Sequence, residues 1–344
     1  MLLLNYRPVL RQPTGIGVYA NAVLQVLQGL PHVLIPGGEE GTAHQRLKRL
    51  AWSQFELPRL ARRHHASLIF TPAPEGYLGP QVISQVVMVH DLRPISYPER
   101  SLQSLYFRAW VPPLLKEAHH VLTNSCFTAR EIQRCTGIPD ERITVIPLGY
   151  DTEVFRPGSI PLESQGRPYL LHVGQAYPHK NLRRLIQAFA QVVQHHPVLK
   201  LVLAGKPHAK ESHQLQLLVA ELGLQQCVEF RPYVPYAELP DLYRGALALV
   251  YPSLCEGFGL PVLEAMACGT PVITSEGSGT EEVAGDAALL VDPADVDVLG
   301  SAMLCMIDQQ ILRDEYQRRG LRRAAQFNWK NTALATQNVL AKLS

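Results

Sequence analysis

The chain has 344 residues, of which 47% are hydrophobic, and its 32 basic and 30 acidic side chains leave a net charge of +2. This length and composition predict two globular domains of ordinary size, and the near-neutral charge gives no general case for nucleic acid as a partner. The six cysteines include no C-x-x-C pair, so the sequence favours reduced thiols and a cytoplasmic protein over a disulfide framework or a zinc site.

Short apolar segments alternate with helical stretches along the whole chain. The expected strands lie at residues 2–6, 33–36, 67–71, 85–90, 120–124, 143–147, 169–173, 199–204, 227–231, 247–251, 270–274 and 288–291. This alternation predicts an α/β protein with two doubly wound, Rossmann-like parallel sheets whose strand ends face a ligand cleft. A linker rich in Pro, Gly and Ser at residues 149–168 divides the chain. We therefore expect domains at residues 1–157 and 158–325 and a final helix at 326–344.

A glycine motif follows the first expected strand and opens an apolar helix. Gly15 and Gly17 superficially match a dinucleotide-binding fingerprint, but Pro8 and Pro13 separate them from the strand, and no suitable acid ends the second strand. We interpret the motif as a glycine loop whose N–H groups face a phosphate. The alternative is a simple helix N-terminus capped by Thr14.

Residues 44–65 are unusually basic. Within residues 44–52 and 60–65 the basic side chains are Arg46, Lys48, Arg49, Arg62 and Arg63. One interpretation is peripheral contact between residues 46–63 and an anionic membrane surface, with Trp52 and Phe55 inserting into the lipid. The other, which the sequence favours, is two ordinary helices broken at Pro58 with solvated basic faces.

The buried strand at residues 85–90 ends in the pair His90-Asp91. A functional interpretation is that His90 donates a hydrogen bond to sugar or acceptor hydroxyls, or handles a proton. The alternative is that Asp91 caps the following turn beside a buried His90.

A second candidate, Lys180, follows the strand at residues 169–173 and precedes a helix at 181–195. A lysine at a strand end can neutralise a diphosphate leaving group. The alternative is a solvated lysine ahead of an Asn181 cap.

The most informative segment runs from Glu256 to Glu264, between the strand at 247–251 and a helix at 261–268. Gly257 and Gly259 let the backbone approach a ligand closely, and Pro261 suits the first helical position. The N–H groups at the helix start form an anion site. We expect Glu256 in the loop and Glu264 in the first helical turn, an arrangement that fits a nucleotide sugar. The alternative is an ordinary strand–turn–helix unit.

Asp295 and Asp297 match a D-x-D pattern with which some transferases hold a metal. Their place just before a helical run predicts N-cap chemistry instead, and we expect no metal site.

Together these motifs resemble retaining glycosyltransferases of family 4, in their mannosyltransferase-like branch, which have the two-domain GT-B fold. The resemblance covers nearly the whole chain. It rests on Gly15 and Gly17, His90-Asp91, residues 145–151, Gly174 with residues 178–181, the E-x7-E element at 256–264, residues 281–285 and residues 327–329. It implies that the first domain faces the acceptor, the second binds the donor, and the final helix crosses back to the first.

The resemblance also implies roles for matching residues. Catalytic roles fall to His90, Lys180 and Glu256. Donor-binding roles fall to Gly15, Gly17, Gly174, Lys180, Lys206, Tyr233, Val234, Ser253, Glu256, Gly257, Phe258, Gly259, Leu260 and Glu264. Within this set Lys180 would hold the diphosphate, Glu256 the sugar hydroxyls and Glu264 the ribose. Gln175 stands where many relatives carry an arginine, so one cation on the diphosphate is either missing or supplied elsewhere, with Lys206 and Arg7 as candidate substitutes.

The implied activity is transfer of a hexose, with retention, from a nucleoside-diphosphate sugar to a hydroxyl of a glycan or lipid-linked acceptor in polysaccharide biosynthesis. GDP-mannose is the first expectation for the donor and UDP-glucose the second, without a metal or other cofactor. The alternatives are a nucleotide-sugar epimerase or isomerase on a similar scaffold and a non-catalytic binder of sugar nucleotides.

Overall fold

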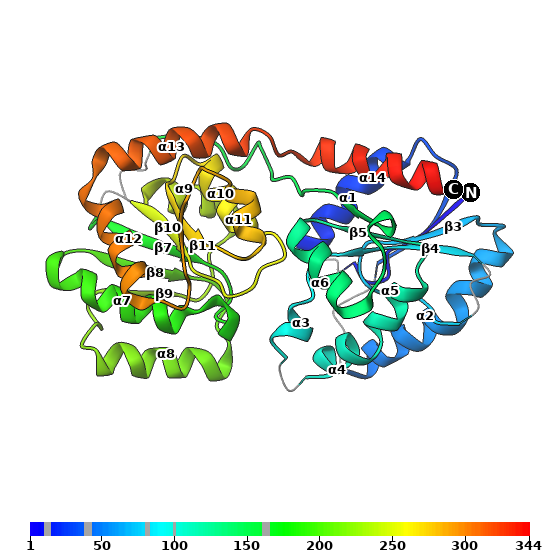
Figure 1. Ribbon diagram of the computed structural model, residues 1–344, viewed down its shortest axis with the longest axis horizontal. Coiled ribbons are helices and arrows are strands. Elements are labelled where there is room, and N and C mark those ends of the chain that lie inside the picture. The colour runs from blue at the N-terminus through cyan, green and yellow to red at the C-terminus, as the bar shows by residue number, and fades with distance from the viewer. Residues whose placement is uncertain (10–14, 38–42, 80–82, 99–100, 160–165) are drawn as a thin grey trace. The chain divides into compact units, whose positions relative to one another are not determined.

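The computed structural model describes residues 1–9, 15–37, 43–79, 83–98, 101–159 and 166–344, and for residues 43–47 and 209 it describes the backbone alone. The chain folds into two compact units (Figure 1). Unit 1 comprises Met1–Gly149 and Asn328–Ser344, and unit 2 comprises Tyr150–Phe327.

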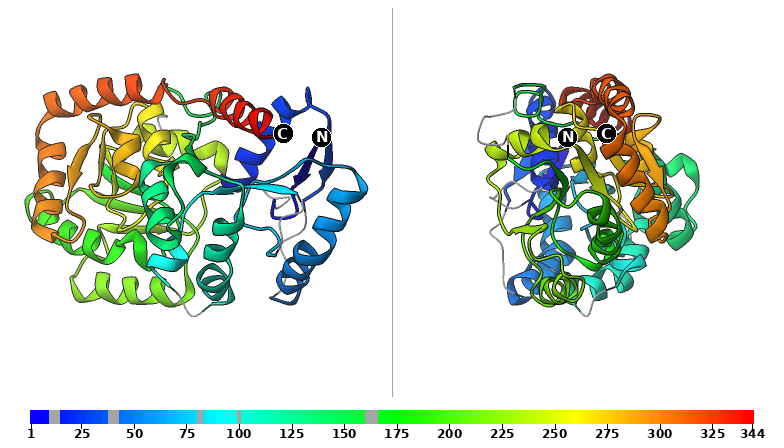
Figure 2. Two further views of the ribbon diagram at one scale, coloured as in Figure 1. Left: turned by 45° about the vertical axis from the view of Figure 1, so that its right-hand side comes forward. Right: turned by 90° about the vertical axis from the view of Figure 1, so that its left-hand side faces the viewer.

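Unit 1 is built on a six-stranded parallel sheet in the order β2-β1-β3-β4-β5-β6. Its strands are β1 (Leu2–Asn5), β2 (His32–Ile35), β3 (Leu68–Thr71), β4 (Ser84–Val89), β5 (His120–Thr123) and β6 (Ile143–Val145). Its helices are α1 (Gly15–Leu27), α2 (Ala43–Arg63), α3 (Arg93–Ser96), α4 (Leu102–Ala109), α5 (Val111–Glu117), α6 (Cys126–Thr136) and α14 (Trp329–Leu343), with a 3-10 turn η1 (Asp140–Arg142). In Figures 1 and 2, α1 and α14 lie together, away from α2.

Unit 2 is built on a second six-stranded parallel sheet in the order β12-β11-β10-β7-β8-β9. Its strands are β7 (Tyr169–Val173), β8 (Lys200–Ala204), β9 (Val228–Arg231), β10 (Ala248–Tyr251), β11 (Val272–Ser275) and β12 (Leu289–Val291). Its helices are α7 (Leu182–His195), α8 (Ala209–Glu221), α9 (Leu239–Gly245), α10 (Leu260–Ala267), α11 (Gly279–Ala284), α12 (Val296–Asp308) and α13 (Gln310–Ala324), with 3-10 turns η3 (Pro178–Lys180) and η4 (Tyr236–Glu238).

Helices cover both faces of the unit 2 sheet, as Figure 1 shows for α7 and α8 on one side and α9, α10 and α11 on the other. On the first side Phe189 of α7, Leu215 of α8 and Met303 of α12 pack against Leu201 and Val250 of the strands. Strands buried on both faces read as continuous apolar runs, which is why the sequence predicts them well. Each expected strand is observed, with ends within two residues of those predicted.

Helix α2 corrects one prediction, because it continues through Pro58 as a single helix. Leu57 and Ala61 flank the proline and are fully buried in the core of unit 1. Their burial outweighs the cost of about 3 kcal/mol that an internal proline carries. Trp52 on the same helix packs against this core beneath Arg7, whose guanidinium carbon lies 4.4 Å from the ring centroid. Trp52 is partly buried by this packing, and its insertion into lipid stays a prediction.

The glycine motif is the second correction. Gly15 and Gly17 lie within the first turn of α1, and Gly17 is buried, so they do not form a loop. Thr14, the alternative cap, lies outside the described residues.

The last helix, α14, packs on α1 within unit 1. Gln337 Nε2 donates to the carbonyl of Val26 at 3.0 Å, and Thr332 Oγ1 donates to the carbonyl of Pro147 at 2.8 Å. The first and last elements thus belong to the same unit.

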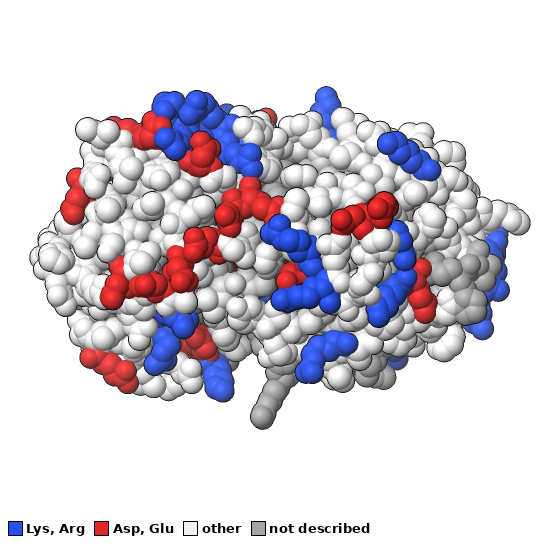
Figure 3. Space-filling view, viewed as in Figure 1, with Lys and Arg blue, Asp and Glu red and all other residues white. Residues whose placement is uncertain are grey.

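The near-neutral net charge conceals an opposition between the units. Unit 1 carries 17 basic and 10 acidic residues, a net +7, and unit 2 carries 15 basic and 20 acidic residues, a net −5. Acidic side chains form a band across unit 2 on the face shown in Figure 3.

Candidate functional site

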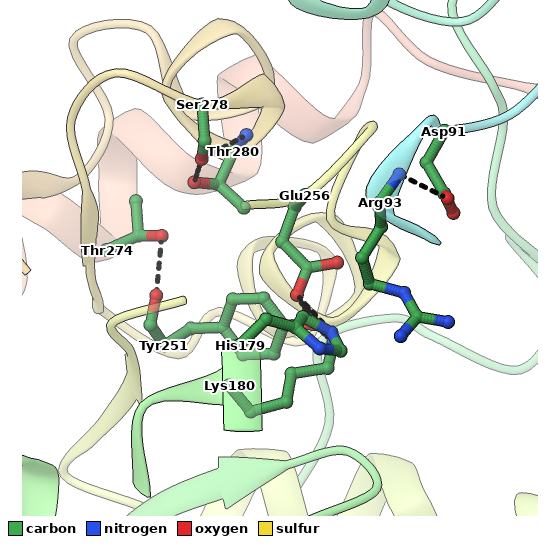
Figure 4. Close-up of polar contacts among 9 residues, drawn as sticks. All are labelled: Asp91, Arg93, His179, Lys180, Tyr251, Glu256, Thr274, Ser278 and Thr280. Atoms are coloured by element: carbon green, nitrogen blue, oxygen red, sulfur yellow. Dashed lines mark hydrogen bonds and ion pairs between the residues drawn. The ribbon is translucent and has the colours of Figure 1, made fainter. Parts of the chain in front are cut away.

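Lys180 and Glu256 meet at the carboxyl edge of the unit 2 sheet (Figure 4). Lys180 follows β7 and Glu256 follows β10, and these strands are neighbours in the sheet. Because the carboxyl ends of parallel strands lie at one edge, residues distant in sequence come together there. Lys180 Nζ lies 2.6 Å from Glu256 Oε1, and the two side chains are only 12% and 15% exposed. The alternative of a solvated Lys180 is therefore wrong.

Tyr251, the last residue of β10, completes this ion pair. Its hydroxyl accepts a hydrogen bond from Lys180 Nζ and donates one to Glu256 Oε1 at 3.3 Å. Lys180 Nζ also lies 4.8 Å from the centroid of the Tyr251 ring. The sequence did not single out Tyr251, although an aromatic residue with a polar tip at a strand end was an available signal.

Both members of the pair are charged at neutral pH. Burial by itself lowers the pKa of Lys180, but Glu256 and Tyr251 raise it, and the net shift is upward. Burial by itself raises the pKa of Glu256, but Lys180 and His179 lower it, and the net shift is downward. His179 is 4% exposed, with Nε2 at 3.9 Å from Glu256 Oε1. The site therefore holds a fixed cation beside a fixed carboxylate.

The loop that carries Glu256 ends at a helix start without a side-chain cap. Gly259 is the N-cap of α10, in a left-handed conformation with φ 103°. A Cβ at Gly259 would lie 2.6 Å from Thr280 Cγ2, so both space and conformation require glycine. Gly279 N donates to the carbonyl of Glu256 at 2.9 Å, which fixes the loop against α11. Pro261 has no N–H, and the N–H groups of Val262 and Leu263 donate to the carbonyl of Gly259 at 3.0 and 3.4 Å, so an anion site at this helix start stays a prediction.

Glu264 differs from the prediction in its place on α10. Since the helix begins at Leu260, Pro261 is its second residue and Glu264 lies in the second turn instead of the first. The left-handed Gly259 ends the loop one residue earlier than the proline suggested. Tyr243 of α9 donates to Glu264 Oε2 at 2.8 Å. Burial raises the pKa of Glu264 to about 7, although this hydrogen bond acts in the opposite direction.

The other predicted donor-binding residues of unit 2 follow its strands or begin α10. Gly174 follows β7, Lys206 follows β8, Tyr233 and Val234 follow β9, Ser253, Gly257 and Phe258 follow β10, and Leu260 is the first residue of α10. Tyr233 is 77% exposed, whereas Ser253 is fully buried. Gln175 and Lys206 are both exposed, and Arg7 is held by Trp52 in unit 1. The second cation on the donor stays a prediction.

His90 follows β4 in unit 1. Its Nε2 lies 3.1 Å from the carbonyl of Pro72, which assigns the ring proton to Nε2, and its ring meets Tyr19 edge-on at 5.2 Å between centroids. Burial lowers the pKa of His90 to about 4, so the ring is neutral. Asp91 Oδ1 accepts a hydrogen bond from Arg93 N at 3.1 Å and so caps the following turn. A role of His90 toward the sugar stays a prediction.

Asp295 caps α12, as predicted, and accepts hydrogen bonds from the backbone N–H groups of Asp297 and Val298 at 2.9 and 3.0 Å. Within the described ranges, no group of three or more His, Cys, Asp or Glu side chains is placed to hold a metal ion. The same part of the chain contains no helix with the length and hydropathy of a membrane span.

Comparison with known proteins matches both halves of the chain to glycosyltransferases. Residues 13–154 match the model of Glycosyltransferase Family 4, and residues 159–323 match that of Glycosyl transferases group 1. The chain is 33% identical over 276 residues to O-antigen chain mannosyltransferase B of Escherichia coli, a stretch covering 77% of this chain and 72% of that protein. It is 36% identical over 216 residues to O-antigen chain mannosyltransferase RfbU of Salmonella typhimurium, which covers 63% of this chain and 59% of that protein.

Solved structures share the fold of this chain. Sucrose-phosphate synthase from Thermosynechococcus elongatus superposes with a TM-score of 0.79 at 20% identity, over 99% of this chain and 98% of the other. Anabaena Alr3699/HepE in complex with UDP-glucose superposes with a TM-score of 0.77 at 19% identity, over 99% of this chain and 100% of the other. At these identities the likeness establishes the fold.

Proposed function

The chain belongs to glycosyltransferase family 4, and we propose that it transfers a hexose from a nucleoside-diphosphate sugar to an acceptor hydroxyl with retention at the anomeric carbon. Its two six-stranded parallel sheets form the GT-B fold of these enzymes. The observation that carries the proposal is the shielded Lys180–Glu256 ion pair of unit 2, in which Lys180 ends the turn η3 after β7 and Glu256 lies in the loop that leads into α10.

Each part of this site suits one charge that develops during transfer. As the bond from the anomeric carbon to the diphosphate breaks, negative charge grows on the leaving oxygen, and Lys180 and the α10 N-terminus stabilise it. The sugar becomes oxocarbenium-like, and the carboxylate of Glu256 stabilises that positive charge. Lys180 supplies the cation that a metal provides in other transferases, so we propose that the reaction is independent of metal ions.

The proposed chemical step is the one that the family resemblance implies. The acceptor oxygen attacks the anomeric carbon on the face from which the diphosphate leaves, and the departing phosphate oxygen takes the acceptor proton. One C–O bond breaks and one forms, and the proton moves to the nucleoside diphosphate. This route retains the configuration without a protein nucleophile.

The donor expectation is GDP-mannose first and UDP-glucose second, with a glycan or lipid-linked acceptor. The mannosyltransferase names of the E. coli and S. typhimurium relatives support a mannose donor. UDP-glucose stays the second candidate, because the Anabaena structure is a complex with UDP-glucose. We place the reaction in the cytoplasm, because each of the six cysteines is a thiol and a reducing compartment keeps it so.

A donor panel tests the function directly. Thermal unfolding is measured with UDP, GDP and ADP and with their sugars, and we expect one nucleotide to stabilise the protein selectively. Transfer from that donor to O-antigen-type glycan acceptors is then followed by NMR, with an anomeric configuration equal to that of the donor. Activity should persist in EDTA. A protein that ignores every nucleotide sugar would contradict the proposal.

The epimerase or isomerase alternative is not favoured by the relatives, which are transferases. It makes a distinct prediction, because the donor sugar would isomerise without any acceptor. Incubation of donor alone, followed by NMR of the sugar, separates the two functions.

A further inference from the structure

Unit 2 contains a cavity of about 240 Å³ on the α7 and α8 side of the sheet. It lies at the carboxyl ends of β7, β8 and β9, and its lining includes His172, Leu203, Ser212, Gln216 and Phe230. Most of the wall is apolar, with polar groups from His172 of β7, from Ser212 and Gln216 of α8 and from Arg231 of β9. None of these five residues was singled out by the sequence motifs.

The cavity adjoins the ion pair through Gly174. A Cβ at Gly174 would lie 3.4 Å from His172 Nε2 and 3.8 Å from Lys180 Nζ, so the imidazole and the ammonium flank the same glycine. Gly205, on the cavity rim, could not carry a side chain, because its Cβ would lie 2.0 Å from the carbonyl oxygen of Gly174. The two glycines let the loops after β7 and β8 approach each other and keep the cavity beside the site.

His172 lines this cavity, and its ring carries a buried acceptor that no described group satisfies. The residue is fully buried, and its Nδ1 lies 3.0 Å from the carbonyl of Val250, which makes Nδ1 the protonated nitrogen. Nε2 therefore carries a lone pair, and it has no hydrogen-bond partner among the described residues. Burial and the neighbouring Lys180 lower the pKa of His172 to about 4, which keeps Nε2 unprotonated at neutral pH.

The ring is held rigidly in this orientation. It stacks on Tyr251 with 5.2 Å between centroids and 11° between planes, and Tyr251 in turn contacts Lys180 and Glu256. Buried acceptors in folded proteins are normally satisfied, so a fixed, unpaired acceptor beside a substrate site points to a ligand group. That group must be a hydrogen-bond donor.

We propose that His172 is a specificity-determining residue for the donor, whose Nε2 accepts a hydrogen bond from an N–H or O–H group of the donor nucleoside in this cavity. The inference rests on the proposed use of a nucleoside-diphosphate sugar. An apolar wall with a few polar groups suits a planar heterocycle or the edge of a ribose. A hydrogen-bond acceptor of fixed orientation discriminates between nucleosides that present an N–H or O–H group to it and those that do not.

Two variants separate this role from a structural one. In His172→Asn the amide nitrogen replaces Nδ1 and keeps the bond to Val250, but no atom replaces Nε2. In His172→Gln the amide oxygen replaces the Nε2 acceptor. We expect His172→Asn to weaken nucleoside-diphosphate binding about fivefold, the effect of one neutral hydrogen bond, with kcat little changed. His172→Gln should recover most of the affinity.

Calorimetry with the nucleoside diphosphate that binds the wild type provides the measurement. The 2′-deoxy, 3′-deoxy and base N-methylated forms distinguish ribose hydroxyls from base N–H groups. Removal of the one hydroxyl or N–H group that donates to Nε2 should weaken binding to the wild type. It should leave binding to His172→Asn unchanged.

The outcomes are distinct. A wild type that binds no nucleoside diphosphate overturns the proposed function, and this inference with it. Equal affinity of the wild type and His172→Asn overturns this inference alone. Equal weakening in both variants together with a lowered Tm assigns His172 a structural role and also overturns it.

Discussion

Lys180 and Glu256 neutralise each other where little water reaches them. Removal of one partner therefore strands the other charge, which affects folding as well as catalysis. A single substitution at Lys180 cannot separate these two effects, but a pair of substitutions can.

Lys180→Met should lower turnover by about 10²- to 10³-fold, because the leaving diphosphate loses its cation. It should also destabilise the protein by about 3 kcal/mol, because Glu256 is left buried and unpaired. The double variant Lys180→Met/Glu256→Gln removes both charges, so most of the stability should return while turnover stays low. Urea unfolding and donor turnover are measured on all three proteins. Recovery of turnover in the double variant would show that Lys180 does not stabilise the leaving diphosphate.

Glu264 makes stability depend on pH. Its pKa is about 7 in the folded protein against an ordinary value of 4.5, so the folded state holds the extra proton between these values. Its contribution to stability is thus fully present below pH 4.5 and is lost as the pH rises through 7. The side chain in Glu264→Gln cannot ionise. As the pH rises from 4.5 to 8, the free energy of unfolding of this variant should therefore rise relative to that of the wild type, by up to about 3 kcal/mol. Urea unfolding across this range tests the shift, and a constant difference between the proteins would contradict it.

At the scale of elements, the join between the Glu256 loop and α10 depends on Gly259. Gly259→Ala would place a Cβ at φ 103° and 2.6 Å from Thr280 Cγ2. We expect a loss of about 2–4 kcal/mol in unfolding free energy and weaker nucleotide binding. Gly277→Ala is the matched control, since Gly277 has φ 75° but open space, and should cost only about 1 kcal/mol.

Thr280→Ser removes the clashing methyl group and should restore part of the stability of Gly259→Ala. The three variants are compared by thermal unfolding and by calorimetry with the preferred nucleoside diphosphate. Equal losses for Gly259→Ala and Gly277→Ala would show that backbone strain alone sets the effect.

The sequence predicts those elements whose signal is local. Buried parallel strands are continuous apolar runs, and their alternation with helices is enough to predict the fold class. The start of α10 was missed by one residue because proline suits either of the first two helical positions, and only the left-handed Gly259 decides between them. The predicted helix break at Pro58 was also wrong. The burial of Leu57 and Ala61 outweighs the tendency of proline to interrupt a helix.

The polar site is predictable only in part. Glu256 and Lys180 carry motif signals, but their 2.6 Å contact joins residues 76 positions apart and depends on β7 and β10 being neighbours. His172 lies in β7 and Tyr251 ends β10, and both strands have the apolar sequence of an ordinary core strand. The spacing of these two residues in the sequence does not predict that their rings stack. Contacts of this kind depend on which strands are neighbours in the sheet, and local sequence patterns do not determine that order.

At the scale of the whole molecule, charge is divided by unit. The net +7 of unit 1 against −5 of unit 2 is invisible in the total of +2. On α2, Lys48, Arg62 and Arg63 are exposed and Phe55 is 61% exposed, whereas Arg49 is bound to Glu75 at 2.6 Å. Exposed basic side chains and an exposed aromatic ring on one helix are the elements of an interfacial contact.

We therefore propose that α2 brings unit 1 to anionic membranes, with Phe55 as the apolar contact. The chain should float with vesicles that contain anionic lipid at low ionic strength, and it should be released by about 0.5 M salt, where surface charge is screened within a few ångströms. Arg62→Glu/Arg63→Glu should abolish flotation. Arg183→Glu/Lys210→Glu makes the same change in charge on exposed positions of unit 2 and should leave it intact. Equal loss in both variants would assign the attraction to net charge, and no flotation of the wild type would show that the basic face of α2 is simply solvated.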